Sequence, residues 1–248
     1  MKIGIAGYGF VGKAHHNVLK SHHDIEIYDP ALKYKNFNQP DAVIICVSTP
    51  QGSHGGCHMD NVYDVVRLAP NVPILIKSTI SLEGWQTLKH MFPNNNFTFS
   101  PEFLRADTAL QDFANTKEIM MGGDDVTFWA NLFTGAMDVN VNIFKPEELI
   151  LIKYFRNSFL ATKVAFFNQI SDLCKVTNID YKIVSEYIGA DERIGKSHTQ
   201  VTSERGFGGH CFPKDTVALV TTAKKNGYNL SILQEAINYN NSIRKDDT

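Results

Sequence analysis

Short apolar runs rich in β-branched residues alternate with amphipathic segments over the first 145 residues of this 248-residue chain. Such runs suit strands that are buried on both faces, and apolar residues recurring every three or four positions suit helices. Strands are predicted at residues 2–6, 25–28, 41–47, 73–77, 97–99, 117–121 and 139–144. Helices are predicted at residues 13–21, 61–68, 81–92 and 125–133. The alternation indicates an α/β fold with a Rossmann-type, doubly wound parallel sheet in a domain at residues 1–145.

The rest of the chain has helical periods and no strand pattern. Pro146 suits the first turn of a helix, and a helical pattern then continues to about residue 176. Shorter helices are predicted at residues 180–188, 215–225 and 230–244. A helix as long as the first usually supports a second domain or a dimer contact. We therefore expect an all-helical domain at residues 146–248 with one long central helix.

Composition narrows the class of protein. The net charge is −2 and the pI about 6.5, so we expect no nucleic-acid partner. The apolar runs are too short to span a membrane, and the N-terminus has no signal-peptide pattern. Four cysteines without disulfide or zinc spacing favour reduced thiols in a cytoplasmic protein. They are Cys46, Cys57, Cys174 and Cys211.

A glycine-rich turn follows the first predicted strand and precedes the first helix. It reads Gly7-Tyr8-Gly9-Phe10-Val11-Gly12, the G-x-G-x-x-G pattern in its expected setting. Its glycines permit a tight turn, a close approach of a pyrophosphate, and close packing of helix on strand. Asp29 ends the second strand, where a carboxylate would bind a ribose 2′-hydroxyl and repel a 2′-phosphate. The pattern predicts NAD as the cofactor, rather than NADP.

Polar residues follow three further strands. Because parallel strands end at one edge of a sheet, Thr49, Thr79 and Glu102 are expected to share that edge and face the nicotinamide. No metal site is predicted. His54, Cys57 and His58 lie in a glycine-rich segment that fits a solvated loop better than a zinc site. The pairs His15–His16 and His22–His23 are expected at surface positions on or beside the first helix.

A second glycine-rich run, Gly206-Phe207-Gly208-Gly209-His210-Cys211-Phe212-Pro213-Lys214-Asp215, lies in the helical part. Its glycines let a ligand approach the backbone closely. A thiol beside an ammonium and a carboxylate is typical of covalent catalysis, which requires an accessible sulfur. The alternative is a tight turn with a small buried thiol.

Lys153 and Asn157 interrupt an apolar row of the long helix. Being four residues apart, they lie one turn apart on one face. Burying an ammonium and an amide is unfavourable unless something binds them, which favours a functional pair over a solvated helix edge.

These motifs resemble the UDP-glucose/GDP-mannose dehydrogenase family. The resemblance extends over nearly the whole chain in the family's order. It rests on residues 7–12, 48–50, 77–79, 100–104, 153 with 157–161, 193–195 and 206–215. It implies oxidation of the C6 alcohol of a nucleotide sugar such as UDP-glucose to a carboxylate, with two NAD reduced per turnover.

The resemblance also implies residue roles. Cys211 would form a thiohemiacetal and then a thioester, Lys153 would act on the C6 oxygen, and Asn157 would stabilise the oxyanion. Asp215 and Thr79 would orient water, and Glu102 would be the base of thioester hydrolysis. The remaining implied contacts are Thr49 and Lys214 with the cofactor, and Phe103, Leu104, Gly206, Phe207, Gly208 and Arg193 with the substrate. Lys153, Asn157 and Glu102 would also contact it.

Arg193 resembles the family's arginine that a partner subunit contributes to the substrate site. This resemblance implies a homodimer built on the long helix. Two features depart from the family pattern. Ala106 stands where an acid is usual, with Asp107 one place later, and the chain ends where a second Rossmann-like domain would begin. We therefore expect this chain alone to bind UDP-sugars weakly and to have low activity.

Two other functions remain open at this point. A β-hydroxyacid-type dehydrogenase shares the layout and a Lys/Asn pair, but transfers two electrons without a cysteine. A non-catalytic NAD-binding module is also compatible with the sequence. Replacing Cys211 with serine should block acid formation in a nucleotide-sugar dehydrogenase and have little effect in a β-hydroxyacid-type enzyme. Reduction of NAD with a panel of UDP- and GDP-sugars separates a non-catalytic module from both enzymes.

Overall fold

The computed structural model describes residues 1–33, 37–52, 55–69 and 71–245. His54 therefore lies outside the described residues. The chain divides into two compact units. The first comprises Met1–Gly52 and Cys57–Lys153, and the second comprises Ser53–Gly56 and Tyr154–Thr248.

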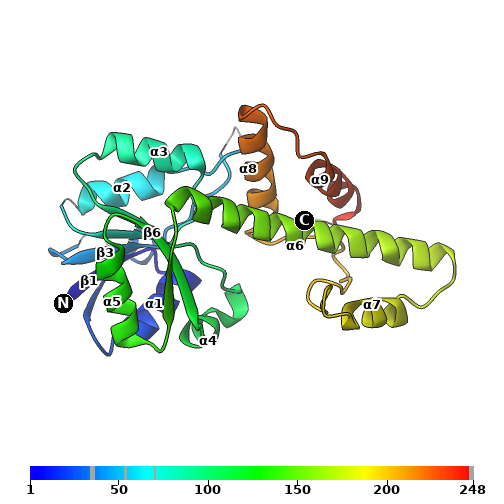
Figure 1. Cartoon of the computed structure of the whole chain (residues 1–248), viewed down its shortest axis with the longest axis horizontal. Coiled ribbons are helices and arrows are strands. Elements are labelled where there is room, and N and C mark those ends of the chain that lie inside the picture. Colours follow the sequence, from blue (N-terminus) through cyan, green and yellow to red (C-terminus); the bar gives the residue numbers. More distant parts are fainter. Residues whose placement is uncertain (34–36, 53–54, 70, 246–248) are drawn as a thin grey trace. The chain divides into compact units, whose positions relative to one another are not determined.

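The first unit is built on a seven-stranded sheet with the order β2-β1-β3-β4-β5-β6-β7 (Figure 1). Its strands are β1 (Lys2–Ala6), β2 (Asp24–Tyr28), β3 (Ala42–Ile45), β4 (Ile74–Ile76), β5 (Phe97–Phe99), β6 (Glu118–Gly123) and β7 (Asn140–Ile143). β1 pairs in parallel with both β2 and β3. The chain thus builds outward from β1 in two directions, and the edge between β1 and β3 is a topological switch point, where ligands bind in such sheets.

The sheet is not wholly parallel as predicted. β5 pairs antiparallel with β6, with Thr98 opposite Gly123, and β6 then pairs in parallel with β7. A parallel neighbour requires a crossover that returns the chain to the opposite edge. Here the connection contains only the 3-10 helix at Ala106–Thr108 and the short helix α4 (Ala109–Ala114), which packs against α1 (Phe10–Leu19). Neither α4 nor the change of strand direction was predicted from the sequence.

Helices cover both faces of the sheet, as a doubly wound fold requires. Figure 1 draws α2 (Asp60–Leu68) and α3 (Leu82–Met91) on one side, and α1, α4 and α5 (Val126–Ala136) on the other. Neighbouring residues along a strand point to opposite faces. Ile44 accordingly packs in the core beneath α1, α4 and α5. Val43 and Ile45 are also fully buried.

The second unit is helical. It contains most of α6 (Pro146–Val176), which begins in the first unit, followed by α7 (Tyr181–Ala190), α8 (Phe212–Lys225) and α9 (Ser231–Ile243). Within the described ranges, none of the helices combines the length and apolar character that crossing a bilayer requires. The predicted fold class is confirmed, and α6 has the predicted bounds.

Candidate functional site

The first glycine turn lies at the switch point. α1 begins at Phe10, three residues earlier than predicted, so Gly9 caps it and is exposed. Gly7 has a φ of +87°, and a Cβ on it would lie 2.7 Å from the carbonyl of Cys46. A Cβ on Gly12 would overlap the carbonyl oxygen of Gly7. The turn therefore brings β1, α1 and the end of β3 closer together than side chains allow.

A pocket of about 290 Å³ opens beside this turn. It is lined by Gly7, Tyr28, Asp29, Pro30, Ala31, Val47, Ser48, Asn61, Asp64 and Val65. Asp29 is fixed in its wall, since its carboxylate accepts hydrogen bonds from the backbone N–H of Tyr8 at 2.8 Å and of Ala31 at 3.0 Å. A glycine cradle at a helix N-terminus with an acid beside it fits the pyrophosphate and ribose of NAD. Phe10 and Val11 form the first turn of that helix.

Glu102 lies at the same edge of the sheet, just beyond β5. Its carboxylate is mostly buried and forms an ion pair with Lys77, which follows β4. Lys77 also donates to Ser100 Oγ at 2.8 Å. His15 Nε2 of α1 lies 3.6 Å from Oε1, the same carboxylate oxygen that Lys77 contacts. Glu102 is thus held by groups from several elements of the first unit.

The other predicted residues of this unit contact the backbone of Glu102, the core or the ends of neighbouring strands. Lys153 is 6% exposed, donates to the backbone oxygen of Glu102 at 2.5 Å, and lies 5.5 Å from the centre of the Phe103 ring. Leu104 packs against the core. Thr49 Oγ1 donates to the backbone oxygen of Thr79 at 2.7 Å, which joins the ends of β3 and β4.

The second glycine turn is held by buried amides of the second unit. Asn168 Oδ1 accepts from the N–H of Gly206 at 3.1 Å. Asn240 accepts from the N–H of Phe207 at 2.6 Å and donates back to its carbonyl at 3.1 Å. The guanidinium of Arg244 lies against Gly208 and also donates to the carbonyl of Arg205 at 3.1 Å. Polar side chains fix this turn.

Cys211 leads directly from this turn into α8. It is exposed and occupies the N-cap of the helix. One helical turn later, Asp215 is fully buried. Its carboxylate accepts from Asn157 Nδ2 and from Lys214 Nζ, both at 2.6 Å. The second unit therefore brings together an accessible thiol, an amide, an ammonium and a carboxylate at the start of a helix, where the macrodipole favours negative charge.

Arg193 stands apart from this group. It lies in the segment after α7, is strongly exposed, and forms an ion pair with Asp191 of its own chain, with N–O distances of 2.5 to 3.2 Å.

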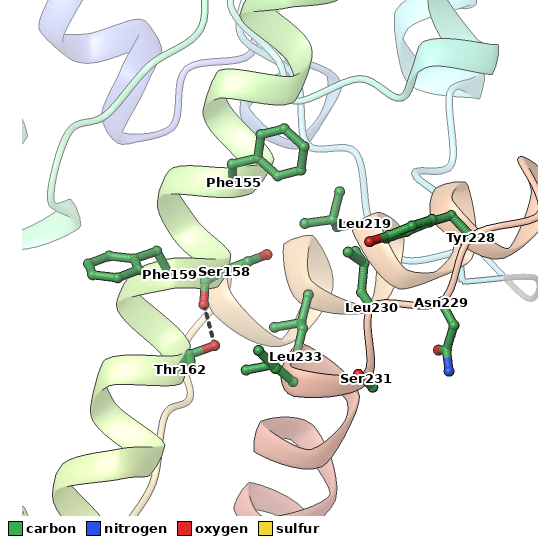
Figure 2. Close-up of a pocket in the computed structure, with 11 residues that line it drawn as sticks. Phe155, Ser158, Phe159, Thr162, Leu219, Tyr228, Asn229, Leu230, Ser231 and Leu233 are labelled. Atoms are coloured by element: carbon green, nitrogen blue, oxygen red, sulfur yellow. Dashed lines mark hydrogen bonds between the residues drawn. The ribbon is translucent and has the colours of Figure 1, made fainter.

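An apolar pocket on the second unit was not predicted (Figure 2). Phe155, Phe159 and Thr162 of α6 form one wall, and Leu219, Tyr228 and Leu233 lie opposite. Phe159 is 69% exposed and Tyr228 is 67% exposed. The pocket is thus an open apolar surface, without the titratable groups that surround Cys211.

The surface position predicted for one histidine was wrong, and several supporting residues were not predicted. His15 is fully buried, not at the surface, because it follows Val11 by one helical turn on the inner face of α1. That spacing was the available signal. For Lys77, the available signal was its position directly after an apolar strand, where a buried ammonium requires an ionic partner. Nothing local marked Asn168, Asn240 and Arg244 as partners of the second glycine turn.

Comparison with known proteins adds the family. The family model described as the UDP-glucose/GDP-mannose dehydrogenase family, NAD binding domain, matches residues 30–133. The model of the central domain of the same family matches residues 148–242. The chain belongs to the UDP-glucose/GDP-mannose dehydrogenase family. The resemblance predicted from the motifs is confirmed, and so is NAD as the cofactor. The glycine turn at residues 7–12 lies before the range that the family model matches. The geometry of this turn and its pocket is therefore support for NAD binding that does not depend on the match.

Relatives in this family include curated enzymes. The chain is 34% identical over 230 residues to UDP-glucose 6-dehydrogenase of Rickettsia typhi, covering 84% of this chain and 52% of the relative. It is 30% identical over 222 residues to UDP-glucose 6-dehydrogenase of Bacillus subtilis, covering 84% and 50%. The chain thus spans about half the length of the curated relatives it matches.

Solved structures share the fold. UDP-glucose dehydrogenase from Pyrobaculum islandicum has a TM-score of 0.85 at 24% identity, over 97% of this chain and 68% of that one. 3-Hydroxyisobutyrate dehydrogenase from Mycobacterium tuberculosis has a TM-score of 0.72 at 17% identity, over 96% and 92%. At these identities the similarity shows the fold alone, which the family shares with a hydroxyacid dehydrogenase.

Proposed function

We propose that this chain carries the catalytic residues for NAD-dependent oxidation of the C6 alcohol of a nucleotide sugar, UDP-glucose to UDP-glucuronate. The observation that carries the proposal is the exposed Cys211 at the start of α8, one turn before the buried Asp215 and its partners Asn157 and Lys214. A two-electron dehydrogenase has no use for this thiol. Oxidation from alcohol to acid needs a covalent stop at the aldehyde.

NAD supplies the acceptor for the hydride in each of two oxidation steps. Lys153 binds the C6 oxygen and helps remove its proton as the alcohol becomes an aldehyde. The Cys211 sulfur then bonds to the aldehyde carbon, and Asn157 donates to the oxygen that gains negative charge. Loss of a second hydride from this thiohemiacetal leaves a thioester. The four-electron oxidation is therefore divided between two hydride transfers from the same carbon.

Water completes the reaction. Glu102 takes a proton from the attacking water, the water oxygen bonds to the thioester carbon, and the carbon–sulfur bond breaks to regenerate the thiolate. Asp215 and Thr79 orient this water. The buried environment of Asp215 suits that role, because the hydrogen bonds from Asn157 and Lys214 fix the carboxylate in one position.

Replacing Cys211 with serine tests the proposal. The chain is incubated with NAD and a panel of UDP- and GDP-sugars, while absorbance of reduced NAD and the sugar product are followed. The parent chain should form an acid with two NAD reduced per sugar. The variant should form no acid, and any oxidation should stop at the aldehyde. An unchanged rate and stoichiometry in the variant would favour the two-electron alternative. No reduction of NAD with any sugar would favour a binding module.

The same proposal includes a homodimer through α6. Phe155, Phe159 and Phe166 are more than half exposed and follow one another at helical spacing, as do Leu173 and Val176 near the end of the helix. Phe159 also lines the pocket of Figure 2, and Phe166 lines an adjoining pocket that shares Thr162, Ser231 and Ile232 with it. An apolar stripe on a long helix is suited to a two-fold interface with the same stripe of a second copy.

Sedimentation or light scattering tests the dimer. Replacing both Phe159 and Phe166 with glutamate should convert the chain to a monomer. Replacing Ile143, an exposed residue of β7, with glutamate is the matched control and should leave the dimer intact. A parent chain that is monomeric at all concentrations would contradict this part of the proposal.

A further inference from the structure

The Glu102 carboxylate has two unlike neighbours at one oxygen. Lys77 forms an ion pair with Oε1, and its side chain is 1% exposed. His15 Nε2 lies 3.6 Å from the same oxygen, and its side chain is fully buried. One neighbour is a cation and the other is an imidazole, and neither has ready access to water. They are therefore expected to act on opposite protonation states of the carboxyl group.

The hydrogen bonds of His15 fix which nitrogen faces the carboxylate. Nδ1 lies 3.0 Å from the backbone oxygen of Val11, which can only accept. A neutral ring must therefore carry its proton on Nδ1, so Nε2 presents a lone pair to Glu102. Nε2 is buried and has no hydrogen-bond partner among the residues that the structure describes. The ring is also stacked on Phe113, with centroids 4.2 Å apart, which limits its movement.

The imidazole remains neutral over the working range of most enzymes. The pKa of His15 is lowered to about 4, mainly by burial; the Glu102 carboxylate opposes this shift, and the Lys77 ammonium adds to it. Two further titratable groups lie near Glu102. Lys153 of α6 donates to the backbone oxygen of Glu102, and burial raises the pKa of the Cys46 thiol, which is neutral. A lone pair facing a carboxylate gains nothing while the carboxylate is ionised, but it can accept once the carboxyl group is protonated.

This inference rests on the proposed role of Glu102 as the base of thioester hydrolysis. We propose that Lys77 and His15 are positioning residues that hold the Glu102 carboxyl group by different contacts in its ionised and protonated states. Lys77 stabilises the ionised carboxylate and fixes Oε1, while His15 Nε2 accepts a hydrogen bond from the protonated carboxyl group. A base must be ionised before it takes the proton from water and must hold that proton afterwards. The two neighbours stabilise these two states.

Carbon-13 NMR of the full chain labelled at the glutamate carboxyl carbons tests the proposal. The Glu102 signal is identified by its loss in Glu102→Gln, and its titration midpoint is measured in each variant. Lys77→Met should raise the midpoint by about one pH unit or more, because the carboxylate loses its cation. His15→Asn and His15→Phe should lower it by about half a unit, because the protonated form loses its acceptor.

Matched variants separate these effects from damage to the fold. Lys77→Arg keeps the cation and should restore most of the midpoint. His15→Phe keeps the stack on Phe113, whereas His15→Asn keeps a donor to Val11, so agreement between them assigns the effect to Nε2. His22→Asn, at an exposed position after α1, should change nothing. An unmoved midpoint in either His15 variant, or shifts of Lys77 and His15 variants in the same direction, would overturn the proposal even where Lys77→Met does not fold.

A second measurement distinguishes this inference from the proposed function. Cys211 is acylated with a small thioester, and its deacylation is followed by intact mass as a function of pH. If Glu102 is the base, the acidic limb of this profile should move with the NMR midpoint in each variant. Midpoints that move in opposite directions while deacylation remains unchanged would retain the paired neighbours and reject Glu102 as the base.

Discussion

The two glycine turns differ in what their glycines touch. In the first turn, a Cβ on Gly7 or Gly12 would meet backbone atoms of Cys46 or of Gly7 itself. In the second turn, a Cβ on Gly206 or Gly208 would meet the amide of Asn240 or the guanidinium of Arg244. Backbone that is fixed in a sheet cannot move aside, whereas the end of a long side chain can.

This difference indicates how each turn keeps its shape. The first is closed on its inner side by β1, β3 and α1, and open at Gly9, where a Cβ would meet nothing within 4 Å. It can offer a ligand only its outer backbone. The second is fixed by side chains that fold with it, so its shape depends on hydrogen bonds that substitution can weaken singly. Alanine substitutions of the glycines should therefore lower the free energy of unfolding by different amounts in the two turns. Measuring these losses tests the contrast between backbone and side-chain contacts.

Gly12→Ala should have the largest effect. The new Cβ would overlap the Gly7 carbonyl oxygen, so β1 and α1 must separate, at a cost of about 3 kcal/mol in the free energy of unfolding. Urea denaturation of the two chains measures it. Gly9→Ala is the control and should leave stability unchanged, yet weaken NAD binding, since the pyrophosphate approaches the backbone there. Equal stabilities of the two variants would show that α1 adjusts easily, and the contrast between the turns would fail.

Acid should weaken the first unit through the helix that follows its turn. The pKa of His15 is lowered from 6.5 to about 4 by burial, so the unfolded chain binds this proton more readily than the folded one. This contribution to stability is complete above about pH 6.5 and should fall by about 2 kcal/mol between about pH 7 and pH 5.

Urea denaturation at several pH values checks the acid effect. His15→Phe has no imidazole to protonate, so its stability should fall by about 2 kcal/mol less over the same range. Parallel curves for the parent chain and the variant would mean that His15 does not titrate differently on unfolding, and the buried placement would be wrong.

Gly206→Ala should have an intermediate effect in the second turn. The φ of Gly206 is +59°, and a Cβ there would displace Asn240 Oδ1 from the N–H of Phe207. We expect a loss of about 1.5 kcal/mol by thermal or urea unfolding, part from backbone strain and part from the hydrogen bond. Gly209→Ala is the matched control, because its φ is +74° with nothing within 4 Å, so it measures strain alone. A loss in Gly209→Ala as large as that in Gly206→Ala would assign no role to Asn240.

The sequence predicts some of these features and not others, for physical reasons. Apolar strands and the turn at residues 7–12 are local patterns, so the fold, α6 and the cofactor were within reach. The direction of β6 depended on α4, whose six residues are too few for a clear period. The partners of the Glu102 carboxylate come from α1 and from the residue after β4, and those of the second turn come from α6 and α9. Contacts between distant segments leave no local pattern, although a lysine ending a buried strand and a histidine on an apolar helix face were visible clues.

Gly208→Ala should have the smallest effect, and it is the most direct test of side-chain as against backbone contact. Its Cβ would overlap the guanidinium of Arg244, which is only the end of a flexible side chain. Arg244 can turn away, losing its hydrogen bond to the Arg205 carbonyl and an ion pair with the exposed Glu204, for about 0.5 kcal/mol. Arg244→Ala should cost a similar amount, and the double variant should cost no more than either, because both remove the same contact. Additive losses measured by urea denaturation would mean that Gly208 meets something less yielding than Arg244, and the second turn would then resemble the first.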